Sequence, residues 1–149
     1  MLIPVNEENP APTGVAEYRR RLTEVREAML GLHKALIESE RTSYEQTFGK
    51  VRSPYQFLKL LTEDPWFAWL RPVSSLIAAM DTALDAKVPL TGVVADELIS
   101  RARKLLVPTR EGEGFSRHYD EAMQRDPDVV LAHAVVAKLI RARSNETPP

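Results

Sequence analysis

The chain has 149 residues, with 20 basic and 21 acidic side chains, a net charge of −1 and no cysteine. This length suits one domain with a single hydrophobic core. The two signs of charge are interleaved along the sequence, which argues against nucleic-acid binding by bulk charge. The absence of cysteine excludes disulfides, thiolate metal sites and cysteine nucleophiles.

Residues 1–12 contain three prolines among polar residues, a composition that buries little surface, so we expect a flexible arm. No basic region followed by an apolar run marks an export signal, and no stretch of about 18 apolar residues indicates a membrane span. We therefore expect a cytoplasmic protein that does not bind membranes.

The first predicted helix begins with Thr13 as its cap and continues toward Gly49, about 35 residues or 50 Å. Its apolar residues recur at alternating three- and four-residue steps, the spacing of a coiled-coil seam. This stripe has two interpretations, a buried face of a helical bundle or a seam that joins two copies of the chain. Its members are Tyr18, Leu22, Val25, Met29, Leu32 and Leu36.

The segment 53–84 holds both tryptophans and half of the aromatic residues, so we expect the other helices to pack around it. Ser53 followed by Pro54 predicts a capped helix start. Asp64 followed by Pro65 predicts a corner, after which residues 66–70 are apolar nearly all round and should be buried. Pro72 either restarts or kinks the next helix, which continues to residue 84.

Three further helices are predicted at residues 91–106, 115–125 and 127–143, with a frayed tail at 144–149. In the last of these helices we expect Val130, Ala134 and Leu139 to form the centre of the buried stripe, with Val129, Val136 and Ile140 widening it. No convincing alternation of polar and apolar residues indicates a strand. The fold class is therefore all-α, a single bundle domain spanning residues 13–143 with five to seven helices.

Two mobile corners flank the unusual aromatic side chains, which suggests a pocket between the tryptophan segment and the helix that starts at Phe115. The glycines of residues 111–114 make either a plain connector or a lid over that pocket. A small-molecule ligand would contact Trp66, Trp69, Arg71, Phe115, His118 and Tyr119.

No motif predicts catalysis or a cofactor. The residues three positions before His33, His118 and His133 are apolar, so the Glu-x-x-His pairs of diiron bundles are absent and we expect no metal. No serine lies in a nucleophile elbow. The sequence leaves enzymatic activity uncertain and favours its absence.

The segment from Tyr119 to Pro127 resembles the end of a tetratricopeptide repeat, in which an aromatic residue, an alanine and an Asp-Pro pair close the second helix. That resemblance implies a helical peptide binder. Residues 67–72 and 112–115 are similar to segments of small bacterial helical proteins of unassigned function.

These observations favour a non-catalytic interaction or regulatory module that binds a protein partner or forms a homodimer through the first helix. The alternative is a small-molecule binding protein or enzyme that uses the aromatic pocket. A tetratricopeptide-like peptide binder is the weaker alternative.

Overall fold

The computed structural model describes residues 10–146 and the side chains of residues 14–141. This part of the chain contains six α-helices and one 3-10 helix, which confirms the all-α prediction. In order they are α1 (Pro10–Phe48), α2 (Pro54–Glu63), η2 (Pro65–Leu70), α3 (Arg71–Asp85), α4 (Gly92–Leu105), α5 (Phe115–Arg125) and α6 (Pro127–Glu146). None of the helices in the described chain is both long and apolar enough to cross a membrane.

Helix α1 begins at Pro10, so Thr13 lies inside the helix and is not its cap. The rest of the predicted arm, residues 1–9, lies outside the described residues, as do residues 147–149 of the predicted tail. Residues 144–146 continue α6.

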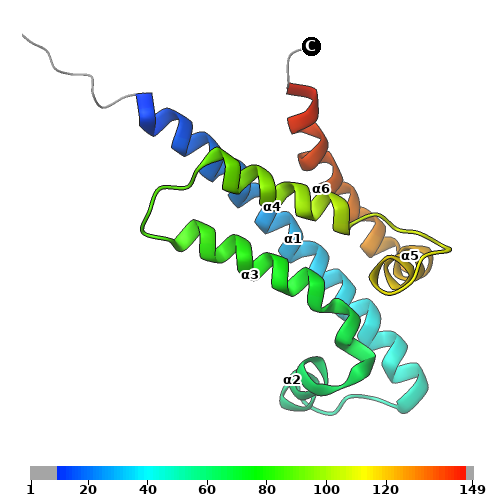
Figure 1. Ribbon diagram of the computed structural model, residues 1–149. Helices are drawn as coiled ribbons and strands as arrows, with labels where there is room; N and C mark the ends of the chain where they lie inside the picture. The colour runs from blue at the N-terminus through cyan, green and yellow to red at the C-terminus, as the bar shows by residue number, and fades with distance from the viewer. Residues whose placement is uncertain (1–9, 147–149) are drawn as a thin grey trace, which may run out of the picture.

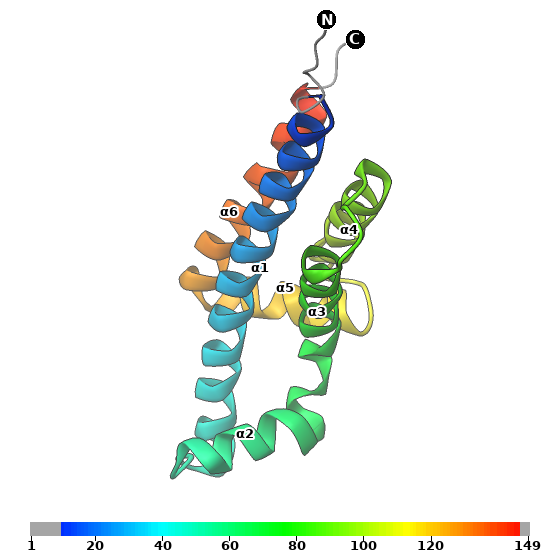
Figure 2. The same cartoon turned by 90° about the vertical axis from the view of Figure 1, so that its left-hand side faces the viewer.

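Helix α1 lies at the centre of the bundle, with α6 on one side and α3 and α4 on the other (Figures 1 and 2). Helices α1 and α6 run antiparallel, since the start of α1 and the end of α6 lie at the same end of the bundle (Figures 1 and 2). Arg26 of α1 forms an ion pair with Asp81 of α3, and Arg19 donates to the carbonyl oxygen of Leu84. These contacts fix the register of α1 against α3.

The apolar stripe of α1 forms the core of the single chain. Leu22, Val25, Met29, Leu32 and Leu36 are at most 1% exposed. Tyr18 is half-buried, and its ring lies so close to Gly92 that an added Cβ there would be 2.6 Å from the ring. A second copy could reach this stripe only after α3, α4 and α6 had separated from it. The predicted dimer seam is therefore the intramolecular core, and we do not propose self-association through it.

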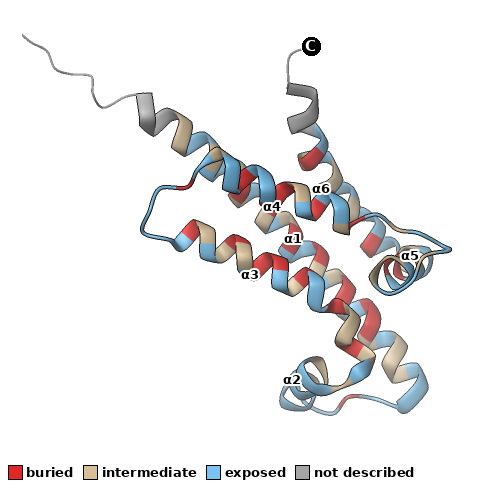
Figure 3. Cartoon of the chain, viewed as in Figure 1, coloured by how far each residue is buried: buried red, intermediate tan, exposed pale blue. Residues whose placement is uncertain are grey.

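The corner at Asp64 forms as predicted, although the segment after it is a 3-10 helix. The Asp64 side chain accepts from the backbone N–H of Trp66 at 2.8 Å, and Pro65 follows as the first helical residue. Only Phe67 and Leu70 of residues 66–70 are fully buried. Pro72 lies in the first turn of α3 and so restarts the helix. Helix α2 has no fully buried residue and lies at the edge of the bundle (Figure 3).

The prediction for the last helix was right about the residues that flank the stripe and wrong about its centre. Val129, Val136 and Ile140 are buried, whereas Val130 and Ala134 are exposed and Leu139 is half-buried. Helix α6 carries apolar residues around most of its circumference, so periodicity could not choose a face. Packing against α1, α4 and α5 chooses it.

Removing either Asp-Pro cap should destabilise the fold. We expect Asp64→Ala and Asp126→Ala each to lower the free energy of unfolding by about 1 kcal/mol, because each side chain accepts a helix-start N–H that would lose its partner. Urea denaturation measures the loss. Asp85→Ala is the control, since Asp85 is exposed at the end of α3. Equal stability of all three variants would contradict the capping role.

Candidate functional site

A buried carboxylate connects three elements at one end of α5. Glu40 of α1 is only 6% exposed. Its Oε2 atom accepts from the indole Nε1 of Trp69 at 2.8 Å, and its Oε1 atom accepts from Arg125 at 3.2 Å. Arg125 also donates to the hydroxyl of the buried Ser39 at 3.1 Å. These bonds join α1 to η2 and to the end of α5.

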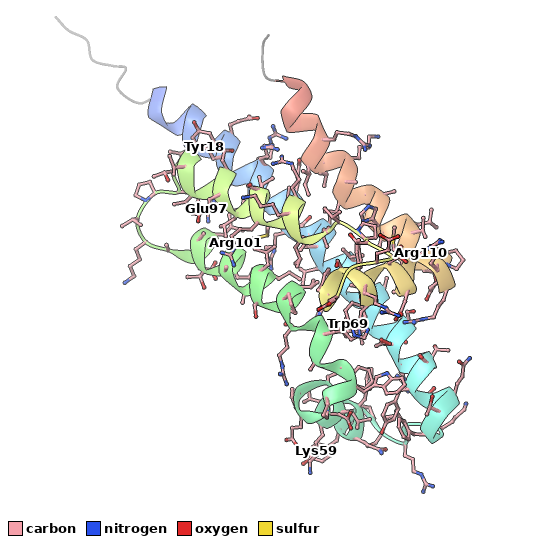
Figure 4. The ribbon with its side chains drawn as sticks, turned by 45° about the vertical axis from the view of Figure 1, so that its right-hand side comes forward. Tyr18, Lys59, Trp69, Glu97, Arg101 and Arg110 are labelled. Atoms are coloured by element: carbon pink, nitrogen blue, oxygen red, sulfur yellow. The ribbon has the colours of Figure 1, made fainter. Side chains whose placement is uncertain are left out.

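A cleft of about 340 Å³ lies beside this carboxylate. The imidazole of His118 stacks on the Trp69 indole, with ring centroids 5.2 Å apart and planes inclined by 19°. Trp69 thus points toward both α1 and α5 (Figure 4). The lining comes from α1, η2 and α5 and comprises Glu40, Ser43, Pro65, Trp66, Trp69, His118, Glu121 and Arg125.

The structure brings together part of the predicted ligand site. Trp66, Trp69 and His118 line the cleft. Phe115 packs on Trp69 at 5.5 Å and stacks on Tyr119, which is fully buried behind it. Arg71 is exposed, donates to the carbonyl oxygen of Thr62 and does not line the cleft.

A backbone hydrogen bond joins the base of the glycine loop to the start of α5. Thr109 N–H donates to the carbonyl of Ser116, and Gly114 adopts a φ of 62° immediately before the helix. An L side chain disfavours that conformation, so glycine suits the position. No residue of the loop lines the cleft, so the structure gives the predicted lid no contact with it.

A second polar contact joins α5 to α6. The hydroxyl of Tyr119 lies 2.6 Å from Nδ1 of His133. Burial raises the pKa of Tyr119 far above its ordinary value, and burial lowers the pKa of His133. Both rings are therefore neutral at pH 7, which lets the phenol O–H donate to Nδ1.

Sequence reasoning missed Glu40, Ser39, Arg125 and His133 as members of this network. A signal for the first two was present. Residues 39 and 40 follow Leu36 at the three- and four-residue steps of the apolar stripe, so a serine and a glutamate occupy buried positions. Arg125 and His133 carried no such signal, because their partners are 86 and 14 residues away.

The charged and polar groups at the centre of this cluster bind one another. The charge of Glu40 faces Arg125, and the indole N–H of Trp69 is already bonded to the same carboxylate. Glu40, Trp69 and Arg125 thus satisfy one another, whereas the indole Nε1 of Trp66, another lining residue, is buried without a hydrogen-bond partner. Among the described residues, no group of three or more histidines and carboxylates is placed to hold a metal ion.

The outer face of α6 is the second candidate site. It consists of Val130, Leu131, Ala134 and Val135, four exposed apolar residues on the side opposite the buried Val129, Val136 and Ile140. Leu131 is 66% exposed and Val135 is 54% exposed. Isolated exposed apolar residues are common, but four that are contiguous on one helix face are typical of an interface.

Comparison with known proteins adds no assignment: no family model, no curated protein and no solved structure matches this chain.

Removing the buried carboxylate should loosen the contact between α1, η2 and α5. We expect Glu40→Ala to lower the free energy of unfolding by about 2 to 3 kcal/mol, because the Trp69 N–H and the Arg125 guanidinium lose their acceptor. Glu40→Gln keeps an acceptor for the indole and should cost about 1 kcal/mol. Glu38→Ala, an exposed position on the same helix, is the control for urea denaturation. A Glu40→Ala protein as stable as the Glu38→Ala control would contradict the structural role.

Stability should fall as the pH decreases below about 6.5, the ordinary pKa of histidine. Burial lowers the pKa of His33 and of His133 in the folded state, so the unfolded chain takes up protons first and is favoured in acid. Urea denaturation at pH 7.5 and pH 5.5 measures the change. The double variant His33→Gln and His133→Gln should lose most of this dependence.

His118→Gln is the matched control and should keep the dependence, because His118 is exposed at the cleft. An unchanged pH dependence in the double variant would show that other groups cause it.

Proposed function

We propose that the protein is a non-catalytic interaction module whose contact surface is the outer face of α6. The observation that carries this proposal is the pair of apolar faces on one helix. The inner face is covered by the bundle, and the outer face exposes Val130, Leu131, Ala134 and Val135. A helix that is apolar nearly all round is normally buried on all sides, so the outer face is expected to have a partner.

The aromatic cleft supports this proposal indirectly. The Glu40 network holds the end of α5, and α5 connects directly to the start of α6 at Asp126 and Pro127. A second contact, between the Tyr119 hydroxyl and His133, joins α5 directly to α6. Both contacts fix the position of α6 from its buried side, so its outer face is a rigid surface. A rigid surface loses less conformational entropy on binding than a mobile one.

The exposed apolar residues elsewhere form a weaker candidate. Phe48, Tyr55 and Leu58 are exposed near α2. Helix α2 has no fully buried residue, so it is less firmly fixed than α6. Leu58 nevertheless provides a useful comparison, since its 59% exposure is close to the 66% of Leu131.

Site-specific photo-cross-linking in the cells that produce the protein tests the proposal. We expect a photoreactive amino acid at position 131 to give an adduct of one discrete mass, because the side chain at that position would lie inside the interface. The same group at Val93 of α4, which is 78% exposed, should give none. Adding Val135→Glu should remove the adduct from position 131.

Purified Val135→Glu protein should unfold within about 0.5 kcal/mol of the wild type, as expected for an exposed position. That result would separate loss of binding from loss of folding. No adduct from position 131, with an adduct from position 58, would move the interface to α2 and contradict the proposal.

A further inference from the structure

We infer that the outer face of α6 binds a second copy of this chain, with the two α6 helices antiparallel across a two-fold axis. This inference rests on the proposed function and names the partner. It is motivated by the order of side chains along α6, where apolar and charged residues are arranged symmetrically about one position.

The apolar pair is centred on position 133. Leu131 lies two residues before this position and Val135 lies two residues after it. In an antiparallel pair centred there, Leu131 of each chain faces Val135 of the other.

The charged pair has the same centre. Asp128 lies five residues before position 133 and Lys138 lies five residues after it, and both are exposed. Asp128, Leu131, Val135 and Lys138 follow one another at steps of three, four and three residues, so they lie along one side of the helix. Antiparallel pairing places Asp128 of each chain opposite Lys138 of the other.

Neither charge has an ionic partner among the described side chains. Among the side chains that the structure describes, Asp128 and Lys138 take part in no ion pair. In a parallel pair, Asp128 would face Asp128 and Lys138 would face Lys138, and both contacts would be repulsive. Positions 128 and 138 are about 15 Å apart along the helix, so one repulsive contact would not be offset by the other. Charge complementarity therefore favours the antiparallel arrangement of two identical chains over the parallel one.

Charge reversal on the full chain tests both the partner and its orientation. Sedimentation velocity over a concentration series should show a reversible dimer of the wild-type protein. Asp128→Lys and Lys138→Asp, made singly, should each weaken dimerisation about tenfold at low salt, because two symmetric ion pairs become two repulsive contacts. The double variant should return to within about twofold of the wild type, because the pairs are restored with their signs exchanged.

Two charge reversals outside α6 serve as controls. Asp85→Lys and Lys87→Asp change the net charge by the same amounts at exposed positions away from α6 and should dimerise like the wild type. A monomer at every concentration would overturn the second copy as partner. A dimer that neither single variant weakens would overturn the antiparallel pairing.

The cross-link from position 131 distinguishes this inference from the proposed function. An adduct of twice the chain mass supports both. An adduct of any other mass overturns the second copy but leaves the outer face of α6 as an interaction surface. A dimer without an adduct at position 131 overturns both.

Discussion

The burial of one stripe of α1 is the constraint on which the rest of the fold depends. Helix α1 packs against α3, α4, α5, α6 and η2, so a single helix supplies one side of most interhelical contacts. Its stripe is apolar as far as Leu36 and then becomes polar at Ser39 and Glu40. The first part is covered by the long helices, whereas the polar part meets Trp69 and Arg125. The change of chemistry along one helix face therefore separates the packed core from the cleft.

The same arrangement determines which surface remains free. Because the bundle covers the stripe of α1, that face of the helix is not available to another chain. Helix α6 covers α1 on one side and exposes valine and leucine side chains on its other side. The apolar stripe of α1, which has the most regular coiled-coil spacing in the chain, thus packs within the single chain. The candidate interface lies on α6, whose apolar pattern is the least regular.

The parts of the fold that the sequence predicts well are those with local causes. Proline and a capping side chain at Asp64-Pro65 and Asp126-Pro127 fix helix starts through bonds two residues long, and both corners were predicted. The stripe of α1 was predicted because polar residues separate its apolar ones. The buried face of α6 was predicted only in part, since apolar residues occupy nearly every direction around the helix and only its neighbours determine which of them are buried. The aromatic cluster was found in part, because its composition is unusual, but its carboxylate partner lies 29 residues away from Trp69.

Hydrogen–deuterium exchange at low and high protein concentration tests most directly the claim that α1 is internal and α6 is external. The account predicts that the amides of α1 between Leu22 and Leu36 exchange equally slowly at both concentrations, because the single chain already covers that stripe. It predicts that the amides around Leu131 and Val135 exchange more slowly at the higher concentration. Protection of α1 that increases with concentration, without a change in α6, would contradict it and show that the stripe of α1 is shared between chains.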